Sequence, residues 1–229
     1  MVNTPSAPTS LPEDLLLLCA DPDTGAARRI RNLDRGLGGA VLTELMLRGA
    51  FTVDEFRILD VRSVAPVDSF ADWVLGELLS AKPRSWSMGL ERWVRKASFE
   101  VGREYRELMA SRGLLRVRTE RALGIFPVTD WTVAEPDRIS ELRRRVDALA
   151  RPEAHPAPSG QPDPRDVHLT ALAAAMRFSR ELYPDWENRD VRRRMKEYLP
   201  AAPIAEAVRM VVRADGSRRG GYSGGGSGM

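Results

Sequence analysis

Apolar side chains recur every three or four positions along most of this chain, the spacing that places them on one face of an α-helix. Stretches with this pattern cover residues 11–20, 30–48, 70–78, 87–111, 139–149, 169–176, 191–198 and 204–211. Between them, residues 51–58 and 114–128 alternate apolar and polar positions, as β-hairpins do, with turns expected at Asp54-Glu55 and Thr119-Glu120. The pattern predicts a mainly α fold, a compact bundle of about eight amphipathic helices carrying two β-hairpins.

Polar residues and glycines mark where these elements begin and end. Ser10 and Glu13 have capping-box spacing, Asp21–Gly25 is a turn signal, and Gly49 and Gly113 follow helices where a left-handed cap is expected. Residues 1–10 are polar and proline-bearing, and residues 215–229 are rich in glycine and serine, so both ends are expected to be disordered. The prediction is a single helical domain over residues 11–214 with a proline-rich loop at 151–164.

One segment occurs twice in similar form, as ELMLRGAF at residues 44–51 and as ELMASRGLL at residues 107–115. A helix that ends in Arg-Gly before a hairpin is also what a winged-helix DNA-binding domain offers. Glutamates interrupt the basic residues of both candidate helices, however, and phosphate binding needs net positive charge along the contact. Nucleic acid is therefore the least favoured partner, and structural re-use of a helix–glycine–hairpin unit explains the similarity better.

Charge, cysteine content and hydrophobicity indicate in which cellular compartment the protein is expected to act. The formal net charge is +3 and the pI about 9.3, an excess too mild to demand nucleic acid or anionic lipid. The lone cysteine, Cys19, cannot form an intrachain disulfide, which fits a reducing cytoplasm. No secretory signal is recognisable, and no segment approaches the roughly 20 apolar residues of a transmembrane helix. Any membrane association is therefore expected to be peripheral.

Residues with catalytic or metal-binding chemistry are sparse. The two histidines, His155 and His168, lack neighbouring ligands, and no nucleophile elbow or phosphate-binding loop occurs. The string GLGGA at 36–40 resembles a dinucleotide-binding fingerprint only loosely, and because it lies in a helical stretch we interpret it as a site of close helix packing. We expect a non-enzymatic protein with no metal site and no cofactor.

Four segments resemble, in order, the Golgi phosphoprotein 3 family: LPEDLLLL, GLGGAVLTELMLRGAF, ELMASRGLLRVRTERALGIF and DPRDVHLTALAAA. The similarity runs over about residues 11–213 and is most specific in the first two segments. It implies a mostly helical domain on the cytosolic face of a membrane. Eukaryotic members bind phosphatidylinositol 4-phosphate and act as adaptors for Golgi enzymes. The basic residues are nearly all arginine, which suits a bacterial, actinobacterial member.

The resemblance also indicates where a lipid headgroup would bind. The family's headgroup-binding tryptophan and arginines correspond to Arg29, Gly38, the pair Ser98–Phe99 and Gly102, so none of those side chains is retained. Other cations lie nearby in the sequence. We therefore expect the headgroup to meet a different set, Arg28, Arg29, Arg31 and Arg35.

In the family, the second hairpin carries apolar residues that enter the bilayer. An arginine near an anionic surface contributes about 1 kcal/mol, so several arginines with a few apolar side chains give weak, reversible docking. The alternative is that the apolar residues pack inward and the arginines are only solvated. The expected membrane-contact residues are Arg116, Arg118, Arg121, Leu123, Ile125 and Phe126.

The resulting hypothesis is a peripheral membrane protein that binds anionic phospholipid headgroups on the cytoplasmic, inner face of the membrane. The alternative is a non-enzymatic scaffold or adaptor that binds a protein partner through its helical surface or through the loop at 151–164.

Overall fold

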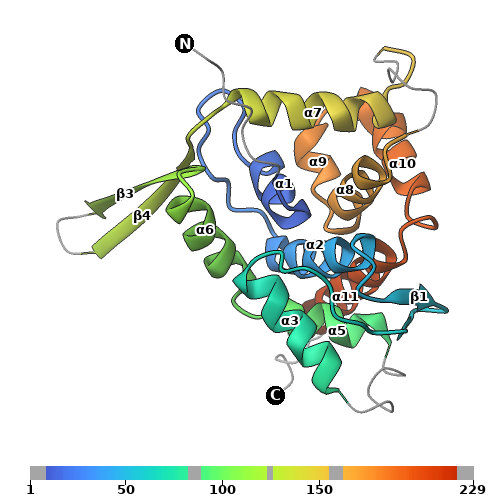
Figure 1. Ribbon diagram of the computed structural model, residues 1–229. Helices are drawn as coiled ribbons and strands as arrows, with labels where there is room; N and C mark the ends of the chain where they lie inside the picture. Colours follow the sequence, from blue (N-terminus) through green and yellow to red (C-terminus); the bar gives the residue numbers. More distant parts are fainter. Residues whose placement is uncertain (1–8, 82–88, 123–125, 155–161, 221–229) are drawn as a thin grey trace, which may run out of the picture.

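The computed structural model describes residues 9–81, 89–122, 126–154 and 162–220. Most of these residues are helical, which confirms the predicted fold class (Figure 1). The helices are α1 (Leu11–Leu18), α2 (Leu33–Leu47), α3 (Ser69–Ser80), α5 (Leu90–Ala97), α6 (Val101–Ser111), α7 (Asp137–Ala150), α8 (Pro164–Ala175), α9 (Ser179–Leu182), α10 (Arg189–Glu197) and α11 (Pro203–Gly220). The strands are β1 (Thr52–Asp54), β2 (Arg57–Leu59), β3 (Leu115–Ala122) and β4 (Phe126–Val133), and η1 is a 3-10 turn at Trp186–Asn188.

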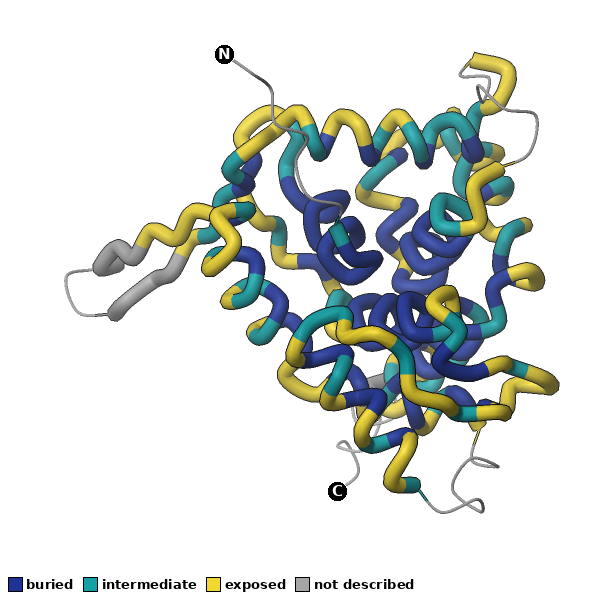
Figure 2. The backbone as a smooth tube through the Cα atoms, viewed as in Figure 1, coloured by how far each residue is buried: buried dark blue, intermediate teal, exposed yellow. Residues whose placement is uncertain are grey.

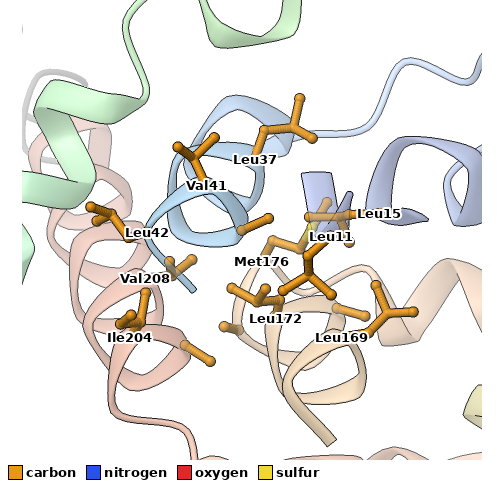
Figure 3. Close-up of a cluster of buried hydrophobic side chains, with 14 of the residues drawn as sticks. Leu11, Leu15, Leu37, Val41, Leu42, Leu169, Leu172, Met176, Ile204 and Val208 are labelled. Atoms are coloured by element: carbon orange, nitrogen blue, oxygen red, sulfur yellow. The ribbon is translucent and has the colours of Figure 1, made fainter. Parts of the chain in front are cut away.

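Helix α2 lies at the centre of the domain (Figure 1). Its residues from Gly36 to Leu45 are all buried, so α2 meets neighbours on every side (Figure 2). Helices α1, α5, α8 and α11 pack against α2, and α3 and α6 also contact it. Figure 3 shows the resulting core, built from apolar side chains of α1, α2, α8 and α11: Leu11, Leu15, Leu37, Val41, Leu42, Leu169, Leu172, Met176, Ile204 and Val208.

Glycine at position 39 permits this close packing. A Cβ placed on Gly39 would lie 2.4 Å from Cγ2 of Val208 and 2.9 Å from Cδ2 of Leu172. Helices α8 and α11 therefore approach the backbone of α2 at a distance that only glycine allows. The interpretation of GLGGA as a helix-packing site is confirmed.

A buried ion-pair network joins α1, α2 and α8. The side chains of Asp14 and Glu44 are only 3% and 4% exposed. Arg165 donates from Nη1 to Glu44 Oε2 at 2.9 Å and from Nε to Asp14 Oδ2 at 3.2 Å. Glu44 also accepts the Leu11 amide at 2.7 Å, which satisfies an N–H at the start of α1. Burial opposes the ionisation of Glu44, but hydrogen bonds from Arg48, Leu11 and Arg165 hold the pKa of Glu44 below its ordinary value.

The two similar segments of the sequence both hold the start of α1. Glu44 belongs to the first segment and accepts the Leu11 amide, as described above. Arg112 belongs to the second and pairs with the buried carboxylate of Glu13. Glu13 in turn accepts the Ser10 amide at 2.7 Å, as the capping-box spacing predicts. The similarity between the segments therefore has a structural role.

The single helix expected over 87–111 is wrong, because α5 and α6 are separate helices. Glu100 adopts a left-handed conformation, with φ of +55°, and caps the start of α6. Val94 and Val101 are both fully buried on either side of this break. Because the buried positions keep their spacing across the interruption, periodicity gives no sign of it. The four-residue helix α9 is likewise too short for periodicity to reveal.

The first hairpin is confirmed, but its turn is displaced by one residue. Asp54 pairs with Arg57, so Glu55 and Phe56 form the two-residue turn, with φ of +44° and +60°. Phe56 was expected on the returning strand and instead lies in the turn, 40% exposed. The apolar character of Phe56 extends the alternating pattern one residue too far.

The second hairpin is longer than expected. Thr119 and Glu120 were predicted to form its turn, but both lie within β3, paired with Thr129 and Val128. The last pair of the ladder is Ala122 with Phe126. The polar pair resembles a turn in sequence, yet polar residues are tolerated in a strand that projects away from the core.

The C-terminal helix also extends beyond the boundary expected at residue 214. Helix α11 continues to Gly220, through residues assigned to a disordered tail. Asp215 in this extension is held by Arg35 and by Arg95. Two ion pairs to distant elements therefore support a stretch whose composition alone predicts disorder.

We expect the buried network to make a large contribution to stability. Replacing Arg165 with alanine leaves buried Asp14 without its ion pair and Glu44 with Arg48 alone, which should lower the free energy of unfolding by about 3 kcal/mol. Urea denaturation followed by circular dichroism measures this loss. Arg144→Ala is the matched control, because Arg144 pairs with Glu141 at the surface and should cost about 0–1 kcal/mol. Equal losses in the two variants would contradict a structural role for the network.

Candidate functional site

The β3–β4 hairpin projects from the helical body (Figures 1 and 2). Only its base is packed: Leu115 and Val133 are buried, whereas Val117, the next residue on that face of β3, is 48% exposed. Arg116 and Arg118 are exposed on the opposite face of β3. The described part of the hairpin therefore presents both basic and apolar side chains to the surroundings.

Four of the expected membrane-contact residues cannot be placed. Leu123 and Ile125 lie outside the described residues, and so do the side chains of Arg121 and Phe126. The expectation that they contact a membrane, and the alternative that the apolar ones pack inward, both stay predictions.

The base of the hairpin is hydrogen-bonded to the segment that carries the candidate arginines. The Ala27 amide donates to the Trp131 carbonyl at 2.8 Å, and the Val133 amide donates to the Gly25 carbonyl at 2.9 Å. Gly25 has a φ of +69° and lies against Thr132, so a side chain at this position would be strained. This pairing fixes the stretch just before Arg28 beside strand β4.

The four candidate headgroup arginines do not form one patch. Arg28 pairs with Asp21, and the hydrogen bonds from Arg28 and Thr24 lower the pKa of the Asp21 carboxyl. Arg35 pairs with Asp215 at 3.0 Å. Within the described part of the chain, Arg29 and Arg31 are exposed and have no ion-pair partner. Two of the four charges are thus compensated by carboxylates, and two are available to a ligand.

Arg31 and Arg35 line an open cleft of about 830 Å³, which we call the arginine cleft. Its walls come from segment 30–35, from residues 98–100 between α5 and α6, from the end of α8, and from α9 and α11. Five arginines line it: Arg31, Arg35, Arg95, Arg177 and Arg180. Four carboxylates line it as well: Asp34, Glu100, Glu181 and Asp215. The cleft is therefore highly charged but close to neutral overall.

Asp215 neutralises two of these arginines together. Its Oδ1 accepts from Arg95 Nη1 at 2.6 Å, and its Oδ2 accepts from Arg35 Nε at 3.0 Å. Partial burial opposes ionisation, but the Arg95 and Arg35 guanidinium groups hold the pKa of Asp215 below its ordinary value. Of the arginines that line the cleft, Arg31, Arg177 and Arg180 have no carboxylate partner among the described residues.

Backbone strain gathers around the arginine cleft. Asn32, Glu100 and Arg177 all line it and have φ of +68°, +55° and +68°. Left-handed conformations cost about 1–2 kcal/mol in non-glycine residues and cluster at ligand sites. Asn32 tolerates the conformation and donates from Nδ2 to the Met176 carbonyl at 3.3 Å. Arg177 is the least expected of the three, because glycine is usual where a helix such as α8 ends.

Gly38 and Gly102 occupy two of the positions where the family resemblance places the headgroup-binding side chains. A Cβ on Gly38 would lie 2.7 Å from Ser98 Oγ and 2.8 Å from the Ser98 backbone nitrogen. A Cβ on Gly102 would lie 2.4 Å from Asp34 Oδ1. Backbone atoms of Ser98 and Ala97 leave no room for an arginine at Gly38, whereas at Gly102 the nearest atom is the end of the exposed Asp34 side chain. The positively charged residues lie instead along the rim of the neighbouring cleft.

Sequence reasoning missed several residues of this surface. Arg95, Arg177 and Arg180 enter the cleft from helices far away in the sequence. Phe99 and Trp73 are 69% and 42% exposed beside it, and both line a shallow hollow that adjoins the cleft. Local charge gave no signal for these arginines, because the strongly basic stretch RDVRRRMK at 189–196 supplies no residue of this cleft. The aromatic pair gives no signal either, because buried and exposed aromatic residues look alike in a sequence.

Other reactive groups lie in structural settings. His168 is 7% exposed, and burial lowers its pKa. Burial disfavours the charged form of Cys19 too and so raises the pKa of its thiol, which stays protonated and unreactive. His155 lies outside the described residues. Within the described residues, no group of metal-ligating side chains converges, and no helix has both the length and the hydrophobicity to cross a bilayer.

Comparison with known proteins identifies the family of the chain. The model of a protein family described as Golgi phosphoprotein 3 (GPP34) matches residues 11–214, nearly the whole chain. No curated protein matches the chain.

The close packing at Gly38 predicts a marked response to a single methyl group. Gly38→Ala should lower the free energy of unfolding by about 1–3 kcal/mol, because backbone atoms of Ser98 and Ala97 cannot move aside easily. Gly76→Ala is the matched control: Gly76 is exposed in α3, an added methyl group there would have nothing within 4 Å, and the variant should gain about 0.5–1 kcal/mol. Denaturant titrations compare the two. A neutral or stabilising effect at Gly38 would contradict the packing described here.

The strain at Arg177 predicts a substitution that stabilises the protein. Arg177→Gly should raise the free energy of unfolding by about 0.5–1 kcal/mol, because glycine adopts the left-handed conformation without steric cost. The comparison is Arg92→Gly in the first turn of α5, which should lower the free energy of unfolding by about 0.5–1 kcal/mol. Thermal unfolding of both variants tests the assignment, and destabilisation of Arg177→Gly would refute the strain.

Proposed function

The chain belongs to the Golgi phosphoprotein 3 family, and on this basis we propose that it is a non-enzymatic peripheral membrane protein that binds anionic phospholipid headgroups. It acts in the cytoplasm, on the inner face of the membrane. Family membership supports lipid binding of the phosphatidylinositol 4-phosphate type as one form of this activity. The headgroup site differs from the family pattern, since backbone packing at Gly38 excludes an arginine and Gly102 carries no side chain.

The observation that carries the proposal is the connection between the projecting hairpin and the arginine segment. The hydrogen bond from Ala27 to Trp131 joins them at the hairpin base. Arg29 and Arg116 are exposed, and neither has an ion-pair partner within the described part of the chain. Each such arginine contributes about 1 kcal/mol near an anionic leaflet. Several acting together give reversible docking without a membrane-spanning segment.

The rim of the arginine cleft supplies the second contact. Arg31 is exposed there, and Phe99 and Trp73 lie exposed nearby. Aromatic rings favour the interfacial region of a bilayer, where one part of the side chain is apolar and another is wet. A headgroup that reaches Arg31 would therefore bring the aromatic side chains toward the interface.

Liposome co-sedimentation tests the proposal. The full chain should sediment with vesicles that contain phosphatidylserine or phosphatidylinositol 4-phosphate, more than with neutral phosphatidylcholine vesicles, and added salt should weaken the binding. The variant Arg29→Glu/Arg31→Glu/Arg116→Glu should lose most of this binding, roughly tenfold or more in affinity, because each substitution reverses one charge.

The matched control is Arg57→Glu/Arg92→Glu/Arg144→Glu, which changes the net charge equally at other exposed positions. It should keep most of the binding. Equal sedimentation with neutral and anionic vesicles would overturn the proposal. Retention of a stoichiometric protein partner without any lipid effect would favour the scaffold function instead.

A further inference from the structure

A second concave surface, which we call the α10 groove, lies between the end of α8, α9, α10 and α11. It has a volume of about 620 Å³, within the usual range for small-ligand sites. Among the described residues, eight cationic side chains and no carboxylate line it: Arg177, Arg180, Arg189, Arg192, Arg193, Lys196, Arg209 and Arg213. This is an extreme local charge for a chain whose formal net charge is only +3.

Carboxylates outside the groove compensate some of these charges. Arg193 pairs with Asp190 at 3.2 Å, Arg189 approaches the same carboxylate at 3.9 Å, and Arg209 pairs with Glu206. The remaining cations have no carboxylate partner among the described residues: Arg177, Arg180, Arg192, Lys196 and Arg213. The α10 groove thus differs from the arginine cleft, where four carboxylates face five arginines.

Arg192 is fixed in place while its charge stays uncompensated. Its Nη1 donates to the Tyr183 carbonyl and also to the Asp185 carbonyl, at 2.7 Å. Neutral carbonyls orient the guanidinium group but do not cancel its charge. Positioned cations reduce the entropy that a ligand must overcome on binding.

Clustered cations repel one another, so a site of this kind is most stable when an anion occupies it. Guanidinium groups match the oxygens of phosphate in a bidentate way, whereas lysine contributes a point charge. Ala174, Ala175 and Leu199 close parts of the groove with apolar surface, which lowers the local dielectric and strengthens charge–charge attraction.

We propose that the α10 groove binds a compact ligand with several negative charges, an oligophosphate or a phosphomonoester group. A bounded groove favours a small ligand over an extended nucleic-acid backbone. The α10 side of the groove lies across the molecule from the β3–β4 hairpin (Figure 1). The site is therefore additional to the docking surface of the hairpin, and its assay in solution does not depend on membrane binding.

Isothermal titration calorimetry with tripolyphosphate and the full-length chain tests this site. We expect saturable binding that weakens as salt is added. The variant Lys196→Gln/Arg213→Gln should weaken it about tenfold or more, because both side chains are exposed in the groove and neither has an ion pair to lose among the described residues. Arg57→Gln/Arg92→Gln is the control with the same charge change at exposed positions elsewhere, and its affinity should match that of the unaltered chain.

Competition then identifies the source of the phosphate. If vesicles containing phosphatidic acid displace tripolyphosphate, the groove accepts a lipid headgroup. If they do not, the groove accepts a soluble phosphate. Either result supports the site. Absence of saturable binding would overturn the proposal. So would equal weakening in both variants, or tighter binding of single-stranded RNA that survives Lys196→Gln/Arg213→Gln. Circular dichroism of each variant verifies that it is folded.

Discussion

Direct contact between the backbone of α2 and its neighbours is the constraint on which the rest of the structure depends. Gly39 lets α8 and α11 approach on one side, and Gly38 lets the residues between α5 and α6 approach on another. Because α2 is buried on every side from Gly36 to Leu45, it sets the positions of the helix ends around it. Those ends supply the charged residues of the surface, so packing of apolar and glycine residues decides where the cations lie.

The packing of α2 also separates this chain from the headgroup-binding pattern that the family resemblance implies. A side chain at position 38 has no room, and the cations that line the neighbouring cleft come largely from helix ends. Two neighbouring surfaces share Arg177 and Arg180 but differ in balance. The arginine cleft holds its own carboxylates, whereas the α10 groove has none in its walls. The arginine cleft, with five arginines and four carboxylates, is therefore nearly neutral, whereas the α10 groove, with seven arginines and a lysine, is strongly cationic.

Much of the helical architecture follows from periodicity, and the failures have definite physical causes. Hydrophobic periodicity does not reveal the break between α5 and α6, because buried residues keep their spacing across it. Both hairpin turns were misplaced, since Phe56 lies in a turn despite being apolar, and Thr119 and Glu120 lie in a strand despite being polar. The candidate arginines were close in sequence, yet Arg28 and Arg35 are paired with carboxylates on different elements.

The sequence by itself determined most of the helices, the existence of the two hairpins, the start of α1 and membership of the family, because each depends on local spacing or on ordered motifs. Only the tertiary structure decided which cations remain available to a ligand. Asp215 compensates Arg35 and Arg95 from 180 and 120 positions away in the chain, while Lys196 and Arg213 line one groove from two helices with no carboxylate in its walls. Charge compensation is a matter of distances of a few ångströms in space, and these distances exist only once the helices have packed.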